Sequence, residues 1–246
     1  MPRADSALPV PVLNDILEAF PSKERERFLL GCDPVELRFA DILAEPGERI
    51  RHVYFPTGSI IAQITPIDRR AGLSVGMVGN EGMVGIPLIL GATTSALPAV
   101  VQNAGSTLRM TAVSFRRELQ CSPVLQSLLN RYLYVVMTQL ARTAACSHFH
   151  VVEARLARWL LMTQDRSHSN QFHVTHKFLA GMLGARRVGV TTAAIALQNR
   201  GLIHYCRGDV TVLDRAGLED ASCACYAVDK ADYIWILGEV RRPSAT

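Results

Sequence analysis

The chain has 246 residues, enough for two modest domains that each enclose a core. Its hydrophobic content of 49% excludes a disordered chain, and a formal net charge of only +4 makes any strongly basic surface a local feature. The six cysteines show no disulfide framework, and the N-terminus lacks a basic segment followed by an apolar core. We therefore expect a cytoplasmic protein with reduced thiols, no signal peptide and no membrane span.

Residues 1–30 predict a helical lead to the first domain, with an irregular, proline-containing start and helices over 14–20 and 23–30. Residues 31–115 predict a β-rich domain, because short apolar or alternating runs are separated by Gly and Pro turn signals. The expected strands cover 35–39, 51–55, 59–65, 73–78, 99–103 and 107–112. Many short strands at this spacing indicate a small antiparallel barrel or roll.

Residues 116–148 predict one long helix, with Ser122 suited to a cap and Pro123 to a first turn. Apolar side chains recur at helical spacing at Leu125, Leu129, Tyr132, Val136 and Leu140. Further apolar residues widen this face, so the helix must bury more than one side. One side can pack on the roll and the other on a second copy of the chain; the alternative is a helix buried within a monomer.

Residues 149–174 are expected to connect the two halves through an amphipathic helix and a polar loop, with the hinge at 147–150. His148 and His150 are separated by one residue, which is poor helical spacing for a shared metal ion, so we interpret them as hinge residues. No metal site is predicted.

The most informative stretch is 175–213. Residues 178–183 and 190–197 place apolar side chains on one face of two short helices, which Gly184 and Gly201 end. A strand from Leu202, a turn at 207–209 and a second strand follow. Helix, turn, helix and hairpin is the order of a winged helix-turn-helix, whose second helix lies in the DNA major groove.

The charge of this region agrees with DNA binding. Residues 166–208 contain no Asp or Glu. They do contain Lys177, Arg166, Arg186, Arg187, Arg200 and Arg207. A surface of one sign attracts phosphate. The alternative is a helical packing unit with an ordinary basic face.

This stretch resembles the DNA-binding domain of the Crp/Fnr superfamily of bacterial transcription regulators. The family's recognition helix often opens with Arg-Glu-x-x-x-Arg; here Arg187 matches the first Arg, Val188 replaces the Glu and Thr192 replaces the second Arg. The family's usual half-site sequence is therefore not expected. Residues 46–48 (Pro-Gly-Glu) and 54–59 (Tyr-Phe-Pro-Thr-Gly-Ser) resemble the start of the superfamily's cyclic-nucleotide-binding-like β-roll.

Together the two resemblances imply an α+β fold with an N-terminal β-roll, a long dimerisation helix and a C-terminal winged helix-turn-helix. The expected parts are the helical lead 1–30, the sensor roll 31–115, the dimerisation helix 116–148, the DNA-binding domain 149–220 and a C-terminal tail 221–246. The implied partners are double-stranded DNA, a second copy of the chain and RNA polymerase, without a membrane.

The resemblance assigns eight residues to DNA: Thr175, His176, Lys177, Arg186, Arg187, Thr191, Thr192 and Arg207. The arginines that begin the second helix enter the major groove, where Arg can make a bidentate contact with guanine. The threonines one turn later reach bases or phosphate. The start of the first helix contacts backbone phosphate, and the wing tip contacts the flanking backbone.

The effector pocket departs from the cyclic-nucleotide binders of the family. Gly85 matches the Gly of their motif, but Ile86 replaces the Glu and no Arg occurs at 96–98. Because a buried phosphate without a cation is poorly stabilised, cyclic AMP and cyclic GMP are not expected to bind in the usual way. The pocket expected from Gly85, Ile86, Leu88, Leu97 and Val100 would take an unknown apolar effector or be filled by its own side chains.

Two alternative functions remain compatible with the sequence: a regulator that senses haem or redox state, and an enzyme. A haem or redox sensor could feed the same DNA output, although no cofactor is predicted. An enzyme would have only unlinked loop residues in the β domain to use, and no nucleophile-and-base pattern is present.

Cys223 and Cys225 could contribute to a metal or redox site, but they lack a second pair and have only Cys206 as a nearby candidate, so a structural role is expected. Trp235 and residues 234–237 are expected to pack the tail on a domain.

Overall fold

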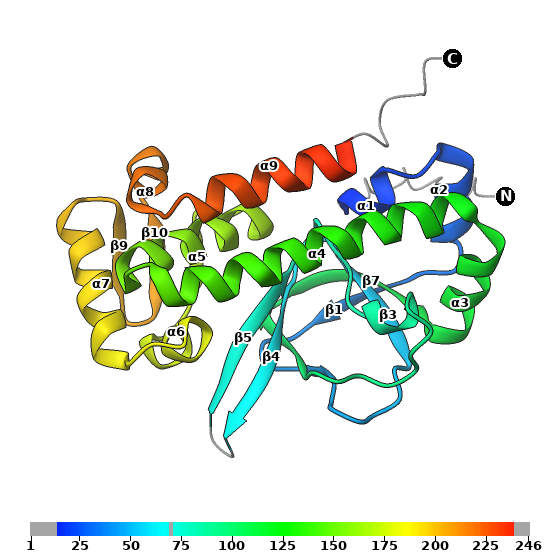
Figure 1. Cartoon of the computed structure of the whole chain (residues 1–246), viewed down its shortest axis with the longest axis horizontal. Helices are drawn as coiled ribbons and strands as arrows, with labels where there is room; N and C mark the ends of the chain where they lie inside the picture. The colour runs from blue at the N-terminus through cyan, green and yellow to red at the C-terminus, as the bar shows by residue number, and fades with distance from the viewer. Residues whose placement is uncertain (1–13, 69–70, 239–246) are drawn as a thin grey trace, which may run out of the picture.

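The computed structural model describes residues 14–68 and 71–238. A β-roll and a helix-rich lobe lie side by side, and one long helix runs across both (Figure 1). The proline-containing start of the predicted lead lies outside the described residues. Helices α1 (Asp15–Glu18) and α2 (Ser22–Leu29) precede the roll. The side-chain amide of Asn14 donates to the carbonyl oxygens of Pro56 (2.9 Å) and Gly82 (3.0 Å), which fastens this lead to two turns of the roll.

The roll consists of two antiparallel sheets. One has the order β1 (Asp33–Leu37), β7 (Gly105–Thr111), β3 (His52–Pro56). The other has the order β2 (Ile42–Ala44), β6 (Ala99–Asn103), β4 (Ile60–Asp68), β5 (Ala71–Val78). The short helix η1 (Ile86–Leu88) lies between β5 and β6 in the chain. All six predicted strands are present; β2 was not predicted, because a strand of three residues carries too short an alternation to detect.

The helix predicted over 116–148 is wrong as a single element. Two helices occupy the region, α3 (Ala112–Cys121) and α4 (Pro123–Phe149). Ser122 between them is extended (φ −124°, ψ 99°), and its hydroxyl accepts a hydrogen bond from the amide of Leu125 at 3.2 Å. The predicted cap and first turn are thus confirmed, and the same cap is what separates the helices.

The helix-rich lobe follows α4. It contains α5 (Val152–Ser167), β8 (Gln171–His173), α6 (His176–Leu183), α7 (Arg187–Asn199), β9 (Ile203–Cys206), β10 (Asp209–Val212) and α8 (Arg215–Ala221). Strand β8 was not predicted; it pairs with β10, so the wing is a three-stranded sheet in the order β8-β10-β9. The core of this lobe is continuous with the roll, because Ile60 and Met77 pack in the same cluster as Leu160 and Leu197.

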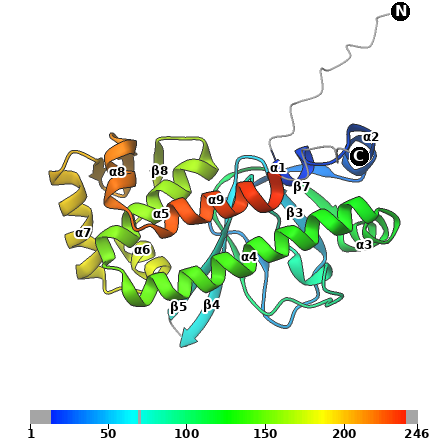
Figure 2. The same cartoon turned by 45° about the horizontal axis from the view of Figure 1, so that its top comes forward.

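The predicted C-terminal tail forms a helix of its own, α9 (Cys225–Gly238). It lies along α4 and runs in the opposite direction (Figures 1 and 2). Ile236 and Leu237 pack in the core of the roll, whereas Trp235 is 64% exposed, so the expectation that Trp235 packs the tail is wrong. None of the described helices is both long and apolar enough to span a membrane.

Candidate nucleic-acid interface

Helices α6 and α7 form a compact helix-turn-helix unit whose ends are set by local chemistry. The hydroxyl of Thr175 caps α6 by accepting from the amide of Phe178 at 3.2 Å. Gly184 ends α6 in the left-handed conformation (φ 57°), and Gly201, with φ 71°, follows the end of α7. Val190 and Leu197 of α7 are fully buried, which fixes the side of α7 that packs on the lobe.

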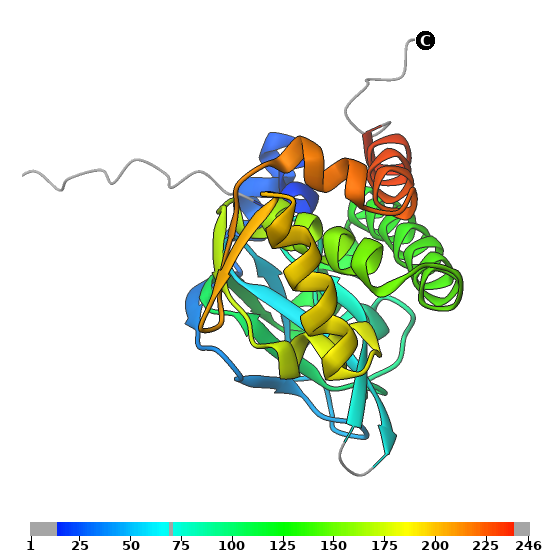
Figure 3. The ribbon, with the colours of Figure 1, turned by 90° about the vertical axis from the view of Figure 1, so that its left-hand side faces the viewer.

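The opposite face of α7 is exposed and lies at the surface of the molecule (Figure 3). Val188, Thr192, Ile195 and Asn199 share this face at spacings of four, three and four residues. Val188 is 77% exposed and Ile195 is 52% exposed. Ile195 and Asn199 were not among the predicted DNA-contacting residues. Both lie on the face of Thr192, three and seven residues further along the helix, so the helical spacing could have identified them. Apolar side chains in this position can contact the methyl group of thymine.

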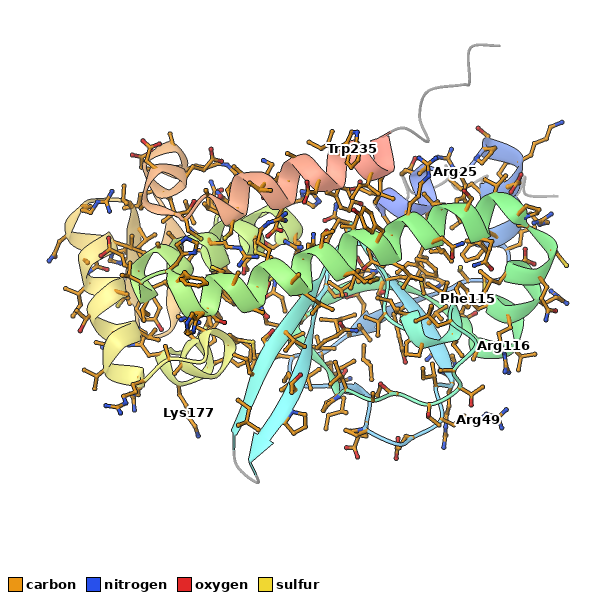
Figure 4. All side chains as sticks on the ribbon, viewed as in Figure 1. Arg25, Arg49, Phe115, Arg116, Lys177 and Trp235 are labelled. Carbon is orange, nitrogen blue, oxygen red and sulfur yellow. The ribbon has the colours of Figure 1, made fainter. Side chains whose placement is uncertain are left out.

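Four cationic side chains surround this face. Lys177, Arg186, Arg187 and Arg207 are exposed, and none of them has an ion pair within the described part of the chain. Lys177 projects from α6 into solvent (Figure 4). Arg207 and Gly208 form a two-residue hairpin turn with positive φ angles of 52° and 95°, which places Arg207 at the tip of the wing.

Two arginines of the basic stretch do not belong to this surface. Arg166 is buried and forms an ion pair with Glu81 of the roll, with a distance of 2.8 Å between Nε and Oε1. Arg200 pairs with Glu153 of α5 at 3.0 Å. Both therefore connect elements of the protein rather than offer free charge to phosphate.

His176 and Thr191 join the two helices to each other. The His176 ring stacks on Tyr205 at a centroid distance of 4.4 Å, and its Nδ1 lies 3.0 Å from Oγ1 of Thr191. The Thr191 hydroxyl also lies 3.0 Å from the carbonyl oxygen of Arg187. Burial, and next the charge of Arg187, lower the pKa of His176 below its ordinary value, which favours the neutral ring. These two side chains position α7, whereas Thr192 on the exposed face stays accessible.

The residues expected to line an effector pocket are not brought together. Leu88 is buried in the core cluster that contains Phe55 and Phe115, and the half-buried Ile86 packs against that cluster. Gly85 has φ 111° and lies against Val53. Leu97, which precedes β6, and Val100 on β6 are half-buried and are not part of that cluster. Ile86 and Leu88 therefore agree with the second alternative, in which the pocket is filled by its own side chains. A cavity of about 420 Å³ lies elsewhere, between β5, α4, α5 and α6, with Met77, Gln139 and Trp159 in its lining.

The stripe expected to face a second copy is mostly used within the chain. Leu125, Leu129 and Tyr132 are at most 3% exposed, and the Tyr132 hydroxyl accepts from the amide of Met83 at 3.1 Å. Their assignment to a dimer surface is therefore wrong, because the roll and α9 already cover them. Along the middle of α4, Tyr134 (53%), Met137 (65%) and Leu140 (39%) are exposed apolar side chains, and Val124 (36%) and Phe149 (77%) are exposed at its two ends.

One set of side chains with metal-binding chemistry was missed. Cys146, His150, Cys223 and Cys225 meet where α4, α5 and α9 converge, and their four candidate ligand atoms all lie within 4.8 Å of one another. The sequence pointed to Cys206 as the partner of the Cys-x-Cys pair, but Cys206 is exposed on β9 and outside this set. The available signal was the spacing of Cys146 and His150, four residues apart at the end of one helix.

Comparisons with known proteins agree with this arrangement. Residues 154–221 match the family model described as a Crp-like helix-turn-helix domain. No curated protein matches the chain. Among solved structures, CLP, a c-di-GMP responsive global regulator from Xanthomonas campestris, is 19% identical with a TM-score of 0.63, and the match covers 78% of this chain and 99% of that one.

Two other structures show a similar fold. FixK2 from Bradyrhizobium japonicum is 12% identical with a TM-score of 0.67, over 78% of this chain and 98% of that one. A CRP family transcriptional regulator from Thermus thermophilus, TTHB099, is 18% identical with a TM-score of 0.64, over 76% and 96%.

Proposed function

We propose, from the premise that this chain has the Crp/Fnr fold and carries a Crp-like helix-turn-helix DNA-binding domain, that it is a homodimeric transcription regulator. In this proposal α7 enters the major groove and each subunit contacts one half of a two-fold symmetric operator. The observation that carries it is the exposed face of α7, with unpaired cations at its start, on the neighbouring helix and on the wing.

Each part of this surface has a different task in the proposed complex. Arg186 and Arg187 begin α7 and can reach guanine, while Val188, Thr192 and Ile195 continue along the groove-facing side. Lys177 on α6 and Arg207 on the wing lie on either side and are suited to the phosphate backbone, which carries no sequence information directly. Half-site preference therefore comes from α7, and most of the affinity comes from the phosphate contacts.

The dimer would form through the exposed side of α4. Tyr134, Met137 and Leu140 recur at three-residue intervals, and their exposure leaves apolar area that a second α4 can cover. A two-fold axis along this helix pair would give two copies of α7 with the symmetry that a palindromic operator requires.

The roll would act as the sensor without binding a cyclic nucleotide in the usual way. Ile86 in η1 stands where the cyclic-nucleotide binders of the family have the Glu that holds the ribose hydroxyl, and residues 96–98 contain no cation for the phosphate. The cavity of about 420 Å³ contacts the roll, α4 and the DNA-binding helices at once, so an effector in it could change how these parts pack. Its chemical identity is not specified by the lining.

A titration with DNA tests the DNA-binding part of this proposal. The full chain is titrated into labelled random-sequence duplex, and fluorescence anisotropy is followed at low and raised salt. We expect binding that weakens steeply with salt, and a loss of at least about tenfold for the double variant K177A/R207A, which removes the two proposed phosphate contacts. Arg49→Ala is the matched control, because Arg49 is also exposed but lies on the roll, far from α7 (Figure 4). Equal affinities of the two variants would contradict the assignment of the interface.

A further inference from the structure

The strongest unassigned feature is the cluster of three thiols and one imidazole at the junction of α4, α5 and α9. Cys146 lies in the last turn of α4 and His150 directly follows that helix. Cys223 precedes α9 and Cys225 is its first residue. Cys146 and Cys223 are buried, and His150 and Cys225 are partly buried. Two segments more than seventy residues apart thus each supply two potential ligands.

The distances within the cluster match a single tetrahedral ion. The sulfur atoms of Cys146 and Cys223 are 3.5 Å apart, and the sulfur of Cys225 is 3.7 Å from Nδ1 of His150. Ligands bound at about 2.3 Å to a tetrahedral zinc ion are separated by about 3.8 Å. An iron–sulfur cluster distributes its cysteines over several iron atoms, which needs wider separations than the 4.8 Å that encloses all four atoms here.

We propose that Cys146, His150, Cys223 and Cys225 bind one thiolate-preferring divalent metal ion of the zinc type. Three thiolates and one imidazole are a ligand set that selects zinc or a chemically similar ion over hard cations such as magnesium or calcium. On binding, the three thiols release their protons to solvent and no ligand is oxidised or reduced.

The residues around the cluster can stabilise the net charge of the proposed metal site. A divalent ion with three thiolates carries one net negative charge, and the guanidinium of Arg158 lies close enough to Cys146 to interact with it electrostatically. Arg158 also donates to Asp229 at 2.6 Å, and Asp229 lies on α9, four residues after Cys225. The ion pair and the metal ligands therefore hold the same end of α9 against α4 and α5.

The position of the site gives it a regulatory consequence. His150 and Val151 are extended (φ −108° and −64°) and form the only residues between α4 and α5. An ion bound to His150 and to the start of α9 fixes the direction in which α5 leaves α4. If α4 is the dimer helix and the next domain contacts DNA, as proposed above, occupancy of the site sets the orientation of the two DNA-binding domains.

A disulfide between Cys146 and Cys223 is the competing use of these thiols. It would leave Cys225 and His150 without a role, although both of their ligand atoms point into the same cluster. The two uses differ in a measurable way, because a disulfide lowers the mass of the chain by two hydrogens and is reversed by reductant, whereas a metal site needs the reduced thiols.

The test uses the full reduced chain, stripped with a chelator, then loaded with Zn²⁺ or Co²⁺ and freed of excess metal. We expect one ion per chain by elemental analysis. The Co²⁺ form should show the intense visible bands and the sulfur-to-cobalt charge-transfer band of a tetrahedral thiolate site. Cys225→Ser and His150→Gln should each lower the affinity, measured in competition with a chromophoric chelator, by roughly a hundredfold.

Cys206→Ser and His148→Gln are the matched controls, since both residues are exposed and lie outside the cluster. The proposal is overturned if the reduced chain binds no stoichiometric ion, if the ligand variants retain it as the controls do, or if only a Cys146–Cys223 disulfide is found. None of these measurements involves DNA, so failure of the metal site and failure of the proposed DNA function are distinguishable.

Discussion

Arg187 and Lys177 lie on neighbouring helices of the same unit and are both exposed cations without an ion pair among the described residues. Arg187→Ala should lower affinity for the operator by about 1–3 kcal/mol and relax base preference, because it removes a donor from the groove. Lys177→Ala should weaken binding to all sequences alike and reduce the salt slope by about 1. Anisotropy titrations with operator and random duplexes measure both effects. Equal losses on the two duplexes for both variants would show that the roles are misassigned.

Asp229 is a buried carboxylate that lies outside the proposed DNA-binding surface. It is 5% exposed and forms ion pairs with Arg142 of α4 and Arg158 of α5. Asp229→Asn leaves two guanidinium groups without this counter-charge, so the free energy of unfolding should fall by roughly 3 kcal/mol. Denaturant unfolding measures the change. Asp232→Asn is the control, because the Asp232 side chain is more exposed and pairs only with Arg142; a loss as large as that of Asp229→Asn would contradict this account.

The sequence predicted single residues well where one local rule decides their position. Ser122 as a cap, Gly184 as a helix end and the wing turn at Arg207 all follow from backbone chemistry within a few residues. The sequence could not show that Arg166 pairs with Glu81, or that Cys146 meets Cys223, because those contacts depend on how distant elements pack. The sequence places Arg166 among the cations that attract phosphate and His176 among the residues expected to contact DNA. In the structure both side chains interact with other residues of the protein.

Helix α4 is the element through which the proposed dimer would form. Its exposed apolar side consists of Tyr134, Met137 and Leu140, and Met137 is 65% exposed. Met137→Glu should introduce a charge next to its own copy across the two-fold axis and shift the chain from dimer to monomer, with little effect on the fold of the subunit. Analytical ultracentrifugation over a range of concentrations measures this change.

Val113→Glu is the control for the α4 variant, because Val113 is also exposed (71%) but lies on α3. If the M137E variant sediments as the unaltered chain does, or if V113E dissociates equally, the dimer does not form through this side of α4.

At the level of elements, periodicity predicted the type of structure better than its boundaries or partners. The repeat of apolar residues after Pro123 gave a helix, but it could not decide which apolar side faces the roll, so Leu125 and Leu129 were placed on the wrong surface. The Cys-x-Cys segment was taken as part of a tail, whereas α9 covers α4 and contributes Ile236 and Leu237 to the core of the roll. Long-range packing of a C-terminal helix leaves only a weak signal in local sequence.

The whole molecule couples its two lobes through a shared core and several interlobe contacts. Ile60 and Met77 of the roll pack with the helices of the helix-rich lobe, and the hydroxyl of Tyr233 on α9 donates to the carbonyl oxygen of Glu81 at 2.7 Å. A change in the cavity between β5, α4, α5 and α6 would therefore alter both lobes at once. The order of a β-roll, a long helix and a winged helix-turn-helix could be predicted from motifs, whereas the position of the cavity could not.

The central claim is that two copies of this chain recognise a two-fold symmetric DNA site through α7. The most direct test is selection of bound fragments from random genomic DNA by the full chain at moderate salt, followed by sequencing. We expect enrichment of an inverted repeat whose half-sites are about one helical turn apart. Enrichment should be lost with Arg187→Ala and retained with Arg49→Ala. Strong binding with no enriched sequence, or enrichment that Arg187→Ala leaves unchanged, would contradict this claim.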